Sequence, residues 1–232
     1  MLRATRGRLA RRIDRRAPPG SVLDVGAGDG ALLDALHRRG RPALGLERSS
    51  DRPDMRTGPI EDAGGPWAAV VAWHTLEHLA EPDRSLEAAA RALAPQGVLF
   101  VAMPNGASLQ ARVFGERWFA LDLPRHLVHL PACLLISRLG ELGLKVERVS
   151  FWRGGQVTFG WLHGLVGLLP GHPDLYDAIR RPSARANALD RRRLATVCLV
   201  AFMLAPAALL AAVLEIALGR AGSVYVEARR GG

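Results

Sequence analysis

Apolar runs of strand length alternate with helical patterns over the first 150 residues of the chain. The segments 31–39 and 82–94 carry apolar residues at helical spacing and end at turn residues, so both are predicted to be helices. Strands are predicted at 21–25, 42–47, within 67–79, and at 98–105, 143–150 and 223–230. Strands that alternate with helices predict a mostly parallel sheet with helices on both faces, which is an α/β fold.

A glycine-rich turn, GAGDG, joins the first predicted strand to the first predicted helix. Strand, glycine turn and helix in this order let a backbone approach a phosphate or a nucleotide. Gly26 and Gly28 suit such an approach because neither carries a Cβ that would collide with the ligand. Glu47 closes the second strand about 20 residues later, where an acid accepts hydrogen bonds from both ribose hydroxyls. The pattern therefore indicates a nucleotide-like ligand.

The glycine spacing here is GxGxG, with Asp24 two residues before the first glycine, and differs from the GxGxxG of dinucleotide enzymes. Together with the segment 71–105 it resembles the class I S-adenosylmethionine-dependent methyltransferases. The resemblance covers 21–150 and the last strand. It implies a Rossmann-like, mostly parallel seven-stranded sheet and S-adenosylmethionine as cofactor. An NAD enzyme is the alternative for the glycine turn alone.

The resemblance also implies a set of cofactor contacts. In chain order these are Asp24, Gly26, Gly28, Glu47, Ile60, Glu61, Trp73 and His74. The first three would line the methionine end of the cofactor, and the acid at the end of the second strand would hold the ribose. The next two would flank the adenine, although GPIEDAGG departs from the usual acidic–small pair of the family. The last two would lie beside the sulfonium.

Methyl transfer to oxygen needs alignment and a base. The segment LDLPRHLVHL, led by Trp118, is similar to one in a bacterial subgroup of these enzymes and lies on the connection that in this fold opens onto the methyl group. We predict that His126, with His129 three residues on, acts as base or orients the substrate. Arg125 would neutralise an acidic group of the substrate. The alternative is that both histidines cap loops and that Arg125 pairs with Asp122.

The segment HTLEHL places His74, Glu77 and His78 on one helical turn, a spacing that can bind a metal. Quinone-biosynthesis O-methyltransferases carry a similar cluster at this place. Polar capping near the cofactor is the commoner use of such residues, and we assign no metal to the site.

A long insertion, 151–222, separates the two predicted antiparallel strands at the end of the chain. Its apolar run 194–214 would reach about 32 Å as a helix, close to the roughly 30 Å of a bilayer core. However, both flanking strands must return to one sheet, both flanks carry arginines, and Pro206 is expected to kink the helix. We therefore expect a bent hairpin in one leaflet or two apolar helices on the membrane surface. A soluble lid or a dimer interface is the alternative.

The net charge of +9 suits nucleic acid or anionic lipid. Cys133 and Cys198 lie in apolar runs, which predicts reduced, buried thiols. The basic N-terminal segment has no apolar core of a signal peptide, so the chain is expected on the cytoplasmic side.

These patterns predict three parts: a cofactor-binding domain at 1–150, an apolar helical insertion at 151–222 that is membrane-associated or a lid, and a final strand at 223–232. The expected function is O-methylation of a hydrophobic or lipid-linked small molecule at the inner face of the membrane, by a peripheral or monotopic enzyme. An RNA methyltransferase and a non-catalytic membrane scaffold are the alternatives. Spread-out basic residues disfavour nucleic acid. The oligomeric state and the acceptor are not predicted.

Overall fold

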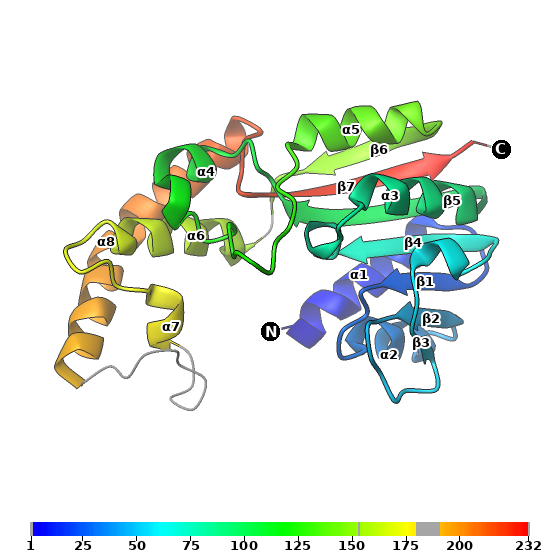
Figure 1. Ribbon diagram of the computed structural model, residues 1–232, viewed down its shortest axis with the longest axis horizontal. Helices are drawn as coiled ribbons and strands as arrows, with labels where there is room; N and C mark the ends of the chain where they lie inside the picture. The colour runs from blue at the N-terminus through cyan, green and yellow to red at the C-terminus, as the bar shows by residue number, and fades with distance from the viewer. Residues whose placement is uncertain (1, 153, 180–190, 232) are drawn as a thin grey trace. The chain divides into compact units, whose positions relative to one another are not determined.

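The computed structural model describes residues 2–152, 154–179 and 191–231, which form two compact units (Figure 1). The first unit comprises 1–104, 132–150 and 225–232, and the second comprises 105–131 and 151–224. The segment that carries His126 and His129 therefore belongs to the same unit as the apolar insertion. Periodicity along the chain does not reveal this grouping, because it depends on contacts between segments far apart in sequence.

The sheet has seven strands in the order β3-β2-β1-β4-β5-β7-β6. Their bounds are β1 Val22–Val25, β2 Ala43–Leu46, β3 Met55–Arg56, β4 Trp67–Trp73, β5 Leu93–Pro104, β6 Leu144–Ser150 and β7 Ser223–Arg230. The pairs from β3 to β5 are parallel, and β6 pairs with β7 in antiparallel register. The predicted Rossmann-like fold is confirmed, including the helical insertion between the last two strands.

Helices cover both faces of this sheet (Figure 1). On one face lie α1 (Leu2–Arg16) and α2 (Ala31–His37), and on the other lie α3 (Pro82–Ala92) and α5 (Ala132–Glu141). Side chains alternate between the two faces along each strand. Ala69 and Val71 of β4 thus point to the same face, where they pack in one cluster with Leu9 and Ile13 of α1. The helix α1 was not predicted, because seven arginines in its sequence obscure the apolar stripe.

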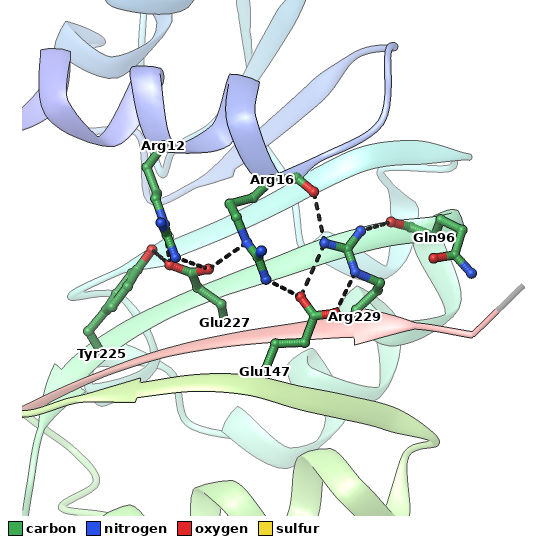
Figure 2. A network of polar contacts seen from close by, with 7 residues as sticks. All are labelled: Arg12, Arg16, Gln96, Glu147, Tyr225, Glu227 and Arg229. Carbon is green, nitrogen blue, oxygen red and sulfur yellow. Dashed lines mark hydrogen bonds and ion pairs between the residues drawn. The ribbon is translucent and has the colours of Figure 1, made fainter.

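An arginine–glutamate network fastens α1 to the last two strands (Figure 2). Arg12 donates two hydrogen bonds to the fully buried Glu227, at 2.7 and 2.9 Å, and Tyr225 Oη donates a third at 2.9 Å. Arg16 bridges Glu227 and Glu147. Arg229 donates to both oxygens of Glu147, and this holds the pKa of Glu147 below its ordinary value. The bidentate geometry compensates for removing a carboxylate from water, so the N-terminal helix is held in one place.

The second unit consists of helices around two apolar clusters. Its elements are α4 (Leu109–Phe114), the 3₁₀ turn η3 (Gly115–Arg117), α6 (Gly155–Gly167), α7 (Leu175–Ile179) and α8 (Arg191–Ala217). Pro206 lies inside α8, which continues as one helix through it, so the turn of a hairpin is not formed at this residue. Among the described residues, α8 is the one helix long and apolar enough to cross a membrane. In its most apolar stretch of 18 residues, 22% is buried.

The prediction of buried thiols is wrong. Cys133 and Cys198 are both free, but both side chains are exposed, on α5 and α8 respectively. Each cysteine lies in an apolar run of which only one side packs against the protein, and each points to the other side.

Candidate functional site

The glycine turn after β1 contains three residues with positive φ, Gly26, Gly28 and Gly30. A Cβ on Gly26 would lie 2.5 Å from Thr75 Oγ1, and this hydroxyl donates to Val25 O at 2.7 Å. A Cβ on Gly28 would meet nothing within 4 Å. The two glycines therefore have different reasons to be glycine. Gly26 lets the turn pack on Thr75, and Gly28 presents its backbone to open space where a ligand has room.

The acid at the end of β2 meets this turn. Glu47 Oε2 accepts a hydrogen bond from the Gly28 amide at 2.7 Å, and Oε1 accepts one from the Arg48 amide at 2.9 Å. Parallel pairing of β1 with β2 places the carboxyl ends of both strands at the same edge of the sheet, which is why residues 19 positions apart touch. The structure thus brings the glycine turn and the predicted ribose-binding acid together.

Asp24 lies in β1 with only 3% of its surface exposed. Burial raises the pKa of Asp24 to about 7, from an ordinary 3.8. The positive charge of Arg6 lowers it and the negative charge of Glu47 raises it, but both effects are smaller than that of burial. A buried carboxylate that is poised near neutrality gains most from a cationic ligand, because a positive charge beside it restores the ionised form.

Arg6 is a site residue that the sequence analysis missed. Its guanidinium lies over the Trp73 ring, 5.4 Å from the centroid, and Trp73 also contacts Tyr225 with 5.9 Å between ring centroids. The same guanidinium acts on Asp24. The signal that could have found it is the apolar stripe of α1, because Leu9 and Ile13 turn inward and fix which arginines face the sheet.

His74 and Glu77 pair with each other after β4. His74 has a positive φ of 55°, and its Nδ1 lies 3.0 Å from Glu77 Oε1. Glu77 is 1% exposed, and its Oε2 has no hydrogen-bond partner in the described part of the chain. The expected helical turn is a short 3₁₀ turn, η2 (Leu76–His78). The pairing has the form of polar capping, and the buried oxygen can accept one further hydrogen bond.

The two residues predicted to flank adenine lie on the 3₁₀ turn η1 (Ile60–Asp62). Ile60 is buried, and Glu61 pairs with Arg84 at 3.3 Å. Both also line a depression of about 400 Å³ together with Pro66, which precedes β4, and Leu93, the first residue of β5. That depression lies at the amino ends of these strands, whereas the glycine turn lies at the carboxyl end of β1. We therefore do not assign the cofactor to this depression.

The second unit holds the histidine segment in a defined conformation. His126 Nδ1 lies 2.7 Å from Ala120 O, and His129 Nε2 lies 2.9 Å from Leu121 O. A carbonyl oxygen only accepts, so these two ring nitrogens carry protons. In the neutral rings, the lone pairs are therefore on His126 Nε2 and His129 Nδ1. The two rings are 6.0 Å apart, in an edge-to-face arrangement.

Arg125 donates to Asp122 Oδ2 at 2.9 Å, and its side chain is 72% exposed. Both contacts of the alternative interpretation, loop-capping histidines and an Arg125–Asp122 pair, are therefore present. They do not exclude proton transfer, because each histidine keeps a second nitrogen and the exposed arginine can change partner.

The fold and the residues around the glycine turn define a class of protein. Residues 1–149 match the family model described as a methyltransferase domain, and the chain belongs to this family of class I S-adenosylmethionine-dependent methyltransferases. S-adenosylmethionine is the cofactor of the family. The described residues fit this cofactor. Open space faces Gly28, Glu47 lies at the end of β2, and the buried Asp24 would be stabilised as a carboxylate by a cationic ligand.

Curated relatives carry one recurring name. The ubiquinone biosynthesis O-methyltransferase of Xanthomonas oryzae pv. oryzae (strain PXO99A) is 31% identical over 153 residues, which cover 56% of this chain and 64% of that protein. The protein of the same name from Xylella fastidiosa (strain 9a5c) is 32% identical over 168 residues, covering 61% and 68%. The chain thus spans less than two thirds of the first of these relatives.

Solved structures support the fold. A SAM-dependent methyltransferase from Archaeoglobus fulgidus superposes with a TM-score of 0.60 at 15% identity, over 98% of this chain and 93% of that one. The magnesium protoporphyrin IX methyltransferase from Synechocystis PCC 6803 with bound SAH gives 0.52 at 18% identity, over 64% and 76%.

Proposed function

We propose that this protein is an S-adenosylmethionine-dependent methyltransferase that methylates an oxygen of a hydrophobic or lipid-linked small molecule at the cytoplasmic face of a membrane. The observation that carries the proposal is the contact between Glu47 and the Gly28 amide, because it joins the two cofactor-binding elements of the family at one edge of the sheet. The relatives named ubiquinone biosynthesis O-methyltransferase support an oxygen acceptor with an apolar body. The exposed apolar helix α8 supports the membrane location.

Three side chains of the first unit would hold the cofactor. Asp24 would receive the ammonium of its methionine part, and Arg6 would receive the carboxylate, since the two side chains already interact. Glu47 would accept hydrogen bonds from the ribose hydroxyls and release the Gly28 amide. When bound, the cofactor supplies an electrophilic methyl group on a sulfonium. The protein's task is then to align the acceptor and to exclude water.

His126 would take the proton of the acceptor hydroxyl. Its Nδ1–H donates to Ala120 O, so in the neutral ring Nε2 is the unprotonated nitrogen, as a base requires. Asp122 Oδ2 lies 3.8 Å from that Nε2 and would stabilise the imidazolium once the proton has moved. Arg125, which pairs with the same aspartate, would turn to an acidic group of the acceptor. His129 would hold the segment in place through Leu121 O.

The test is transfer of labelled methyl from S-adenosylmethionine to a membrane extract, followed by separation into organic and aqueous phases. We expect label in the organic phase with the native protein and little with His126→Ala. The matched control is His37→Ala, which removes a partly exposed histidine at the end of α2 in the first unit. Undiminished transfer by His126→Ala removes this residue from the mechanism. Recovery of the label in RNA would show that the acceptor is RNA and not a lipid-like molecule. Tight cofactor binding without any product would favour a non-catalytic scaffold.

A further inference from the structure

The long helix of the second unit carries a continuous exposed apolar face. Its buried side chains form one stripe, Val197, Ala201, Ala208, Ala212 and Glu215. Every exposed side chain of α8 from Cys198 onward is uncharged. The large apolar side chains exposed on α8 are Leu199, Phe202, Met203, Leu209, Leu210, Val213 and Leu214, with exposed fractions from 52% to 76%. At about 100° per residue, the exposed positions cover about 200° of the helix circumference.

A face of this width fits lipid better than a second protein. A helix that packs on a protein core turns an apolar stripe a little over 100° wide toward it, and a coiled-coil seam is narrower still. The arc on α8 is about twice as wide, whereas acyl chains cover any width. Arg192 is exposed at the start of the helix and Arg220 is exposed just after its end. Arginines at both ends suit anionic headgroups on both sides of one apolar stretch.

The opposite face of α8 shows how the helix would meet the bilayer. Val197 and Ala201 pack with Leu175 and Ala178 of α7, and Ala208 and Ala212 pack with residues of α4 and α6 such as Phe114 and Trp161. The helix is therefore covered by protein along its length, from the first turns to the last. A helix that crossed the bilayer would take these partner elements into the hydrocarbon with it.

Those partner elements are not suited to hydrocarbon. Exposed charged side chains stand on α4 and η3, among them Arg112, Glu116 and Arg117. Each would cost several kcal/mol at the centre of a bilayer. Glu215, on the protein side of α8, is fully buried and accepts hydrogen bonds from the Gln110 amide and from Trp161 Nε1, both at 2.9 Å. The protein side of the helix is thus built for contact with protein and water.

We propose that α8 is a monotopic docking helix that lies in the plane of an anionic bilayer. The face centred on Leu199 and Leu210 enters the acyl chains, and Arg192 and Arg220 reach the headgroups. This inference rests on the proposed function in one respect, which is the membrane location. It identifies the surface of the protein that would contact the membrane. It needs neither cofactor nor acceptor, so the two can fail separately.

Flotation of the full chain with vesicles tests the surface. We expect binding to phosphatidylcholine vesicles that contain phosphatidylglycerol, and a loss of at least tenfold in bound fraction for the triple variant Phe202→Gln, Met203→Gln, Leu210→Gln. The matched control is Leu134→Gln, which changes a side chain that is 55% exposed on α5. Arg192→Gln is expected to weaken binding to the anionic vesicles and not to pure phosphatidylcholine. Equal binding by the triple variant overturns the proposal, provided its circular dichroism matches the native protein.

Depth measurements separate lying in the plane from crossing. Single-cysteine variants Leu199→Cys and Leu210→Cys, in a Cys133→Ser, Cys198→Ser background, carry a fluorophore on the same face, about 16 Å apart along the helix. Equal quenching by lipids brominated at one depth supports docking in the plane, and a depth difference close to that spacing overturns it. A lipid-free dimer that the triple variant abolishes, with no vesicle binding, assigns the face to a second copy and overturns it too. Vesicle binding without methyl transfer counts against the proposed function alone.

Discussion

Glu47 accepts a hydrogen bond from the backbone amide of Gly28, with 2.7 Å between the nitrogen and Oε2. The carboxylate thus occupies a donor that faces open space, and a ligand with hydroxyl groups can take its place. We expect Glu47→Ala to weaken binding of S-adenosylhomocysteine 10- to 100-fold, because a hydrogen bond to a charged group contributes about 1.5–3 kcal/mol. Calorimetric titration measures this change in affinity. Asp51→Ala, an exposed acid four residues on, is the control, and unchanged affinity in Glu47→Ala would contradict the assignment.

The two neighbouring glycines should respond differently to alanine. Gly28→Ala is expected to cost about 1–2 kcal/mol of unfolding free energy, the penalty of a left-handed backbone alone, yet to impair cofactor binding strongly. Gly26→Ala adds a collision with Thr75 and should cost about 3 kcal/mol or more. Urea unfolding and calorimetry on the same samples measure both effects. Equal losses of stability in the two variants would contradict the different roles of the two glycines.

Asp24 should make both stability and cofactor binding depend on pH. Its pKa is raised to about 7, so the folded state retains a proton that the unfolded state loses near pH 4. The contribution of this residue to stability is therefore full below pH 4 and falls, by up to about 4 kcal/mol, as the pH rises through 7. A cationic ligand reverses the preference, since it favours the carboxylate.

We therefore expect the affinity for S-adenosylmethionine to rise about tenfold between pH 6 and pH 8. Asp24→Asn should bind weakly and lack that slope, and equilibrium dialysis across the range measures both. The same slope in the variant would show that another group titrates.

Arg6 should matter for the cofactor more than its neighbours on the same helix. Arg6→Gln removes the charge over Trp73 and beside Asp24, and we expect about a tenfold weaker affinity for S-adenosylmethionine. Arg8→Gln changes an exposed arginine of α1 and serves as the control. If both variants bind equally well, the guanidinium of Arg6 has only a structural role.

Glu215 should determine the stability of the second unit. It accepts from the Gln110 amide, Gln110 Nε2 and Trp161 Nε1, so Glu215→Ala strands three buried donors and should cost about 3–5 kcal/mol of unfolding free energy. Burial raises the pKa of Glu215, so Glu215→Gln, which keeps an acceptor oxygen, should lose clearly less. Thermal unfolding followed by Trp fluorescence measures the difference, and equal losses would contradict the role of the hydrogen bonds.

Local pattern was sufficient for the nucleotide-binding part of the protein. The strand, glycine turn and helix, and the acid at the end of β2, are short-range features, because backbone geometry and side-chain spacing decide them within about ten residues. The parallel order of the strands then follows from the alternation with helices. These features predicted the fold and assigned the glycine turn and Glu47 to one ligand, and the structure shows the two in contact.

Only the tertiary structure decided which distant residues meet. Arg6 reaches Trp73 because α1 is fastened to β6 and β7 by Glu147 and Glu227, more than 130 residues away along the chain. Residues 105–131 join the insertion for the same kind of reason, through contacts such as Gln110 with Glu215. Periodicity reports which side of an element is apolar and leaves open which surface covers it. For that reason the apolar run 194–214 predicted a helix, while its buried stripe and its broad exposed face emerged only from the packing.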